Sequence, residues 1–183
     1  MTDPQAPVAL LLRGVNVGGR NRLAMADLRA LLERLGCTDV RTYLQSGNAV
    51  VVPPPGAGDL AGLVEAGVEA LMGRPVTVLA RTGPELADAL AASPFPPEDP
   101  TKVHLAFLAS QAPPLTADPA TYAPDGLVLG DRVAYLWYPE GAGRAKLTGA
   151  LLDRALGRVV ATARNLRTVT ELVRLTGATP PPP

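Results

Sequence analysis

Residues 8–15 read VALLLRGV, a continuous apolar run with the composition of a buried strand. Apolar residues at helical spacing follow from Met25 to Leu35, and Gly36 ends this helix. The Ser46-Gly47 turn then separates two short strands. With a second amphipathic helix and a fourth strand, the first half has the order βαββαβ, which is typical of the ferredoxin-like fold. The remaining expected elements are strands Val40–Gln45, Asn48–Val52 and Pro75–Arg81, and the helix Leu60–Leu71.

The same order returns after a linking helix, Glu85–Ala92, and a proline-rich connector, Ser93–Pro100. The crossover Pro113–Tyr122 is interrupted by prolines and holds at most a short helix. The sequence shows no residue-level repeat, so the duplication rests on the pattern alone. The expected elements are strands Lys102–Ala109, Gly126–Leu129, Val133–Tyr138 and Val159–Ala163, and helices Lys146–Leu156 and Leu166–Leu175.

These patterns predict an α+β protein made of two ferredoxin-like (βαββαβ) subdomains with antiparallel sheets, plus a C-terminal helix. We expect the first subdomain over residues 1–82 and a linking helix with its connector over 83–100. The second subdomain is expected over residues 101–178, and residues 179–183 are expected to be a disordered tail.

The charge balance is even, with 17 basic and 17 acidic residues, which disfavours nucleic acid or a membrane surface as a partner. Cys37 is the only cysteine, so an intrachain disulfide is impossible and a reducing compartment fits. No apolar run reaches the roughly 18 residues of a membrane span, and residues 1–4 lack the order of a signal peptide. We therefore expect a cytoplasmic protein that does not bind membranes.

Polar residues converge at one edge of the first predicted sheet. In a ferredoxin-like sheet the first and third strands are antiparallel neighbours, so Arg13 should lie beside Asn48. The loop Gly14–Arg22 should then meet the turn Gln45–Asn48. This edge would carry donors from Arg13, Asn16, Arg20, Arg22, Gln45 and Asn48.

A second polar cluster is expected where the third and fourth strands of the other half end. Its members are Arg144, Lys146, Arg164 and Asn165. Both clusters are rich in donors and poor in acids, and we expect them to line one anion-binding cleft. The alternatives are two separate solvated edges, and loop Asn and Gly residues that only satisfy turn geometry. Thr168 with Glu171 fits a capping box, and Asn165 has the residue type of a helix cap as well.

Several chemistries are disfavoured by the residues available. With His104 as the single histidine and one cysteine, no metal-ligand set or nucleophilic triad can be assembled. Residues 14–21 nearly spell a phosphate-binding loop, but Arg20 and Asn21 replace its lysine and its hydroxyl residue. The first and third strands lack the stacking aromatics of an RNA-binding ferredoxin-like domain.

Four segments carry a resemblance to a known family. Residues 11–21 (LLRGVNVGGRN) and 42–48 (TYLQSGN) look like the two N-terminal signatures of a bacterial family of uncharacterised proteins, domain of unknown function 1697. Residues 145–147 (AKL) and 162–169 (TARNLRTV) are similar to its later segments, with Leu166 where the family has Trp and Ala163 where it has Thr. The resemblance implies a pair of ferredoxin-like subdomains and implies no activity. Lys146 matches a family lysine in a chain with only two lysines, which favours an ammonium there.

Three functions stay open at this point. The first is binding of a small anionic ligand or nucleotide at the Arg/Asn/Gln-rich sheet edges. The second is an enzyme that uses Lys146 or an arginine to stabilise negative charge. The third is a protein-interaction module. The sequence identifies no cofactor and no oligomeric state.

Overall fold

The computed structural model describes residues 5–17, 22–96 and 98–180. Contacts divide the chain into two compact units. The first unit comprises Met1–Leu86 and Leu172–Thr179, and the second comprises Ala87–Glu171 and Pro180–Pro183. No helix in the described part of the chain is long and apolar enough to cross a membrane.

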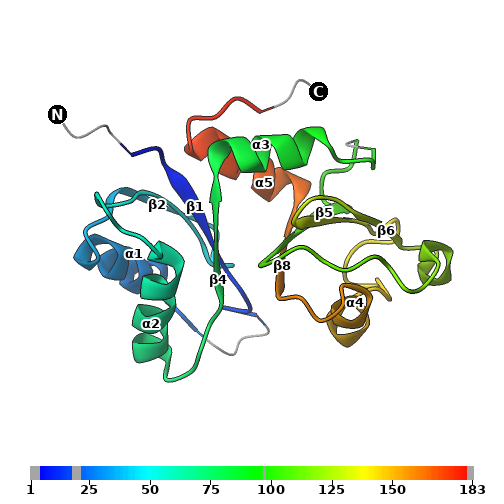
Figure 1. The fold of residues 1–183 in the computed structure, drawn as a ribbon, viewed down its shortest axis with the longest axis horizontal. Coiled ribbons are helices and arrows are strands. Elements are labelled where there is room, and N and C mark those ends of the chain that lie inside the picture. The colour runs from blue at the N-terminus through cyan, green and yellow to red at the C-terminus, as the bar shows by residue number, and fades with distance from the viewer. Residues whose placement is uncertain (1–4, 18–21, 97, 181–183) are drawn as a thin grey trace. The chain divides into compact units, whose positions relative to one another are not determined.

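The first unit has the predicted βαββαβ order. Its four strands form one sheet in the order β2-β3-β1-β4, and all neighbours are antiparallel. The two helices lie on the same face of this sheet (Figure 1). The elements are β1 (Val8–Leu12), α1 (Met25–Arg34), β2 (Thr38–Tyr43), β3 (Asn48–Val52), α2 (Leu60–Met72) and β4 (Val78–Thr82), followed by α3 (Gly83–Ala91).

Local sequence signals set the ends of α2. The carboxylate of Asp59 accepts a hydrogen bond from the backbone N–H of Gly62 at 3.0 Å, which caps the start of the helix. Gly73 ends it with a left-handed backbone, φ 70°, a conformation that glycine adopts without strain. The helix therefore begins and ends where its capping residues place it.

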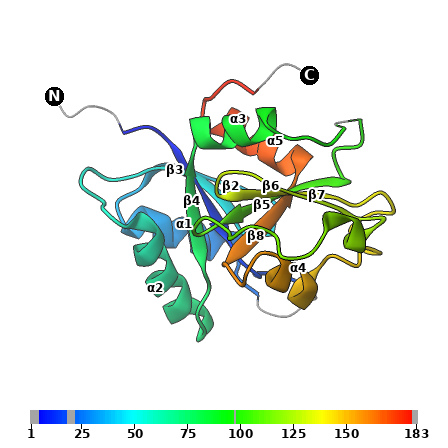
Figure 2. The ribbon, with the colours of Figure 1, turned by 45° about the vertical axis from the view of Figure 1, so that its right-hand side comes forward.

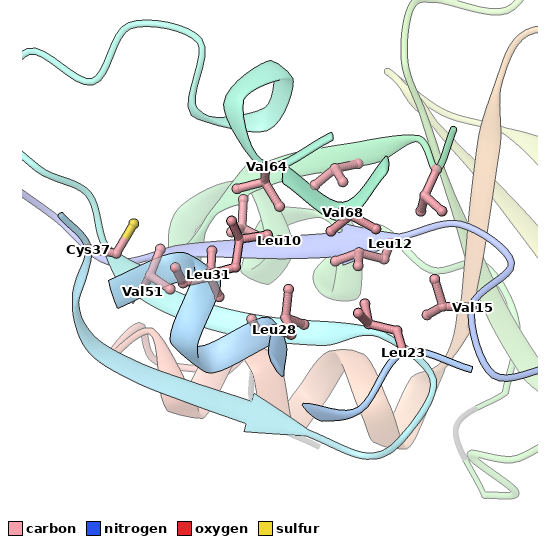
Figure 3. Close-up of a cluster of buried hydrophobic side chains, with 14 of the residues drawn as sticks. Leu10, Leu12, Val15, Leu23, Leu28, Leu31, Cys37, Val51, Val64 and Val68 are labelled. Carbon is pink, nitrogen blue, oxygen red and sulfur yellow. The ribbon is translucent and has the colours of Figure 1, made fainter. Parts of the chain in front are cut away.

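The core of the first unit forms between the sheet and its two helices. Figure 3 shows Leu10 and Leu12 of β1 gathered with Leu28 of α1 and Val64 of α2, and all four are buried. Burying each such side chain contributes about 1.5–3 kcal/mol. Cys37 belongs to this cluster, as its residue type predicts, and burial raises the pKa of its thiol. Val15 and Leu23 also belong to the cluster, so both ends of the loop after β1 are anchored in the core.

The second unit repeats the order with one helix reduced. Its sheet has the order β6-β7-β5-β8, again antiparallel throughout. The predicted crossover contains only a short 3-10 helix, η1 (Pro119–Tyr122), and α4 covers the same sheet face (Figure 2). The other elements are β5 (Val103–Leu108), β6 (Gly126–Leu129), β7 (Val133–Trp137), α4 (Gly149–Ala155), β8 (Ala161–Asn165) and α5 (Leu166–Leu175).

Hydrogen bonds of the two sheets match position by position. The N–H of Leu12 donates to the carbonyl of Gly47 at 2.9 Å, and the N–H of Leu108 donates to that of Arg132 at the same distance. The N–H groups of the following residues, Arg13 and Ala109, donate to the carbonyls of Thr77 and Val160 at 2.8 and 2.9 Å, each one residue before the strand on the other side. The duplication that the sequence pattern suggested is therefore present in the backbone register of each unit.

Candidate functional site

The loop after β1 and the turn before β3 lie together, as predicted. Leu11 pairs with Asn48 in the sheet, so the end of β1 lies beside the start of β3. The side-chain N–H of Asn16 donates to the carbonyl of Gln45 at 2.6 Å. We call this end of the first sheet the N-terminal edge. Of the residues predicted there, Arg20 lies outside the described part of the chain.

Asn16 holds the loop to the turn. Besides its bond to Gln45, its Nδ2 donates to the carbonyl of Leu23 at 2.9 Å and its Oδ1 accepts the N–H of Leu23 at 2.8 Å. Its backbone is left-handed, with φ 55°, a conformation that asparagine tolerates better than most residues. The amide of Asn16 is therefore used in shaping the edge.

Asn48 shapes the same turn from the other side. Its side chain is fully buried, and its Nδ2 donates to the carbonyl of Tyr43 at 3.0 Å and to the hydroxyl of Ser46 at 3.1 Å. Both contacts close the turn between β2 and β3. The turn geometry that sequence reasoning kept as an alternative thus accounts for these bonds of Asn48.

An open pocket of about 500 Å³ lies at the N-terminal edge. The start of α1 forms one wall, and the end of β2 with the following turn forms the other. Arg29 donates from Nη1 to the hydroxyl of Thr42 at 2.7 Å, so a guanidinium is held at the pocket. The lining residues are Ala24, Met25, Ala26, Arg29, Thr42, Leu44 and Gln45. We call this space the α1 pocket.

Arg29 and Thr42 were not predicted as site residues, whereas Gln45 was. Arg29 follows Met25 by four residues and so shares its face of α1, but this period alone does not place that face against Thr42 of β2. Ala24 occupies the cap position of α1, and its side chain accepts no hydrogen bond from the first turn. Such first-turn N–H groups have no partner inside the helix. Asp27 lies in this first turn and is not among the lining residues.

Three arginines, Arg22, Arg29 and Arg74, contribute positive charge at the N-terminal edge. Arg74 donates from Nη2 to the carbonyl of Gly14 and from Nη1 to that of Pro75, both at 3.3 Å. Within residues 5–17, 22–96 and 98–180, no carboxylate forms an ion pair with Arg22, Arg29 or Arg74. Arg13 is exposed at the same edge, and its backbone N–H is bonded to Thr77. Positive charge is thus held at this edge by carbonyl and hydroxyl groups.

In the second unit, the loop that carries Lys146 is anchored by a carboxylate that sequence reasoning missed. Asp125 is buried, and its Oδ2 accepts the backbone N–H groups of Lys146 at 2.7 Å and Leu147 at 2.9 Å. Thr148 has an extended backbone (φ −136°, ψ 169°), so α4 begins at Gly149 and the predicted start at Lys146 was wrong. The Lys146 side chain is exposed. Tyr138 donates to the carbonyl of Leu147 at 3.0 Å, and burial, assisted by Asp125, raises the pKa of Tyr138 to about 12.

Arg164 and Asn165 lie at the end of β8, where both form local bonds. Arg164 is buried and donates from Nη1 to the hydroxyl of Thr162 at 2.8 Å and to the carbonyl of Ala163 at 2.9 Å. Burial lowers the pKa of Arg164 to about 10, which leaves it charged at neutral pH. Asn165 accepts the N–H of Thr168 at 2.9 Å, so Asn165 caps α5 and the capping role predicted for Thr168 was wrong.

The ends of β7 and β8 both flank the start of β5, as predicted, because Trp137 pairs with Val103 and Asn165 with His104. That this cluster and the N-terminal edge line one cleft stays a prediction.

His104 lies with its ring centre 5.1 Å from that of Tyr138, and burial lowers the pKa of His104. In the part of the chain that the structure describes, no three His, Cys, Asp or Glu residues are grouped to hold a metal ion.

Two consecutive four-stranded antiparallel sheets with βαββαβ connections define the class: an α+β protein of paired ferredoxin-like subdomains. The chain belongs to the family described as protein of unknown function (DUF1697), whose model matches residues 6–135. It is also similar to a solved structure, that of conserved bacterial protein SP0830 from Streptococcus pneumoniae. That likeness has a TM-score of 0.69 and 22% identity over 93% of this chain and 98% of the other, and it shows the fold. Comparison with curated proteins gives no match.

Proposed function

We propose that this protein binds a small anionic ligand, such as the phosphate group of a nucleotide, in the α1 pocket. The observation that carries the proposal is the guanidinium of Arg29, held at the pocket by the Thr42 hydroxyl at 2.7 Å. A guanidinium presents several N–H donors in a fixed plane, so one bond to a hydroxyl leaves others for a ligand. Hydrogen bonds from guanidinium to phosphate or carboxylate are among the strongest in proteins.

The surroundings of Arg29 support an anion over a cation. The described lining includes no carboxylate, and the start of α1 presents backbone N–H groups without a side-chain cap. Arg22 and Arg74 add positive charge at the same edge without acidic partners among the described residues.

The lining also favours binding over acid–base catalysis. The described lining residues include no histidine, cysteine or carboxylate that could act as a general base. Lys146, the residue considered for an enzymatic role, belongs to the second unit and does not line this pocket. We therefore favour recognition of an anion over its chemical conversion.

The test measures binding of inorganic phosphate, pyrophosphate and a panel of nucleotides by calorimetry and by thermal stabilisation. Arg29→Ala should weaken the binding of any hit by about 10- to 150-fold, the range for one charge-assisted hydrogen bond. Binding should also weaken as salt rises from about 0.01 to 0.15 M, because ions screen the attraction.

Two matched variants serve as controls. Arg34→Ala removes an arginine from the last turn of the same helix and should leave binding unchanged. Thr42→Val breaks the bond to Arg29 and keeps its charge, so it should weaken binding less than Arg29→Ala does. The proposal is wrong if no anion binds, or if Arg29→Ala and Arg34→Ala affect binding equally.

A further inference from the structure

Leu44 has an unusual position at the α1 pocket. It lines the pocket, its side chain is 54% exposed, and its backbone is left-handed with φ 57°. Leucine rarely adopts this conformation, and turn positions with positive φ are usually filled by Gly, Asn or Asp. An exposed leucine in a strained turn conformation is not explained by the stability of the fold.

The turn that holds Leu44 is longer than its counterpart in the second unit. Tyr43 pairs with Asn48, which leaves residues 44–47 in the turn. In the second unit the N–H of Gly130 donates to the carbonyl of Val133 at 2.8 Å, which leaves only residues 131–132. The second unit therefore reaches the same strand pairing without the two extra turn residues. In the first unit the longer turn places the apolar side chain of Leu44 at the pocket.

We infer that the ligand is an amphipathic organic anion, a phosphate ester whose small apolar group lies against Leu44. This inference rests on the proposed function and names the ligand class for that pocket. Arg29, Thr42 and Gln45 give the pocket a polar part, and Leu44 with Ala24, Met25 and Ala26 gives it an apolar part. A volume of about 500 Å³ is within the range of sites for small organic ligands.

The experiment compares inorganic phosphate with phenyl phosphate on the full chain by calorimetry. Phenyl phosphate should bind at least about tenfold tighter, the factor expected when about 60 Å² of apolar surface leaves water. Leu44→Asn should remove this advantage, so that the variant binds the two probes with similar affinity. Because asparagine accepts a left-handed backbone more readily, the same variant should be at least as stable as the natural protein.

Leu63→Asn is the matched control, because Leu63 is a leucine of similar exposure, 48%, on α2 and does not line the pocket. It should leave the binding of both probes unchanged. Equal affinities for the two probes, or an advantage of phenyl phosphate that survives Leu44→Asn, would overturn the inference and leave the proposed anion site standing. Absence of binding by both probes, and by the nucleotide panel, would overturn the proposed function itself.

Discussion

Replacing Asn16 with alanine removes three side-chain hydrogen bonds at the N-terminal edge. One is donated to the carbonyl of Gln45 and joins the loop after β1 to the turn before β3; the other two, one donated to the carbonyl and one accepted from the N–H of Leu23, join the two ends of that loop. The variant also places alanine in a left-handed backbone with φ 55°. Both changes destabilise the N-terminal edge, on which the geometry of the α1 pocket depends.

The expected loss follows from these contacts. A hydrogen bond contributes about 0.5–1.5 kcal/mol net, and Asn16 is only half-buried, so three lost bonds cost about 2 kcal/mol. The left-handed backbone adds about 1 kcal/mol for alanine. A total of about 3 kcal/mol corresponds to a fall in Tm of about 6–12 °C for a chain of this size.

The measurement is urea denaturation followed by circular dichroism, because the single tryptophan, Trp137, lies in the second unit. Asn16→Gly is the matched control. It loses the same bonds without the backbone strain, so it should be about 1 kcal/mol more stable than Asn16→Ala. A loss below about 1 kcal/mol in Asn16→Ala would show that the three bonds do not hold the edge together.

Three further predictions concern single residues. Gly47→Ala should lower the free energy of unfolding by about 2–4 kcal/mol, because the backbone of Gly47 has φ 78° and an added Cβ would lie 2.9 Å from the Cβ of a leucine in β1. Gly56→Ala is the control: its backbone has φ 73° but the space around it is open, so it should lose only about 1 kcal/mol. Asp125→Asn should lower the pKa of Tyr138 from about 12, while burial keeps it above the ordinary value of 10.0. Ultraviolet titration of the tyrosine measures this change. An unchanged pKa would show that the carboxylate of Asp125 does not contribute to the raised pKa of Tyr138. The free energy of unfolding should fall as pH decreases below about 6.5, because burial lowers the pKa of His104 and the unfolded chain then binds more protons than the folded one. This pH dependence should disappear in His104→Phe. If it persists in that variant, groups other than His104 cause it.

The fold was predictable because its signals are local. The apolar run of β1, the helical period of α1 and the turn residues between β2 and β3 lie within short segments, and their order determines the ferredoxin-like arrangement. The start of α4 was wrong for a long-range reason. Asp125 is more than 20 residues from Lys146 and accepts the N–H groups of Lys146 and Leu147, and Thr148 after them has an extended backbone, so α4 begins only at Gly149.

The candidate site was predictable only in part, and for the same reason. Antiparallel pairing of β1 with β3 brings Asn16 to Gln45, and that pairing follows from the fold. The contact of Arg29 with Thr42 depends on how α1 lies against β2, which periodicity does not specify. The exposure of Leu44 depends on its backbone angle, which the sequence alone does not reveal.

The two units also help to separate features of the scaffold from features of the α1 pocket. Arg81 and Arg164 occupy the same register position, opposite Ala9 and Leu105, and each guanidinium donates to the carbonyl of the preceding alanine. A feature present in both units is explained by the shared fold. The α1 pocket instead forms where the first unit departs from the second: a helix of 10 residues stands in place of a 3-10 helix of 4, and the turn is longer. The second unit builds the same sheet with a shorter turn, so the sheet does not require the extra turn residues, whereas α1 also supplies the core with Leu28 and Leu32. Recognition of a ligand gives the extra turn residues a role, and binding to the Arg29 and Leu44 variants tests it.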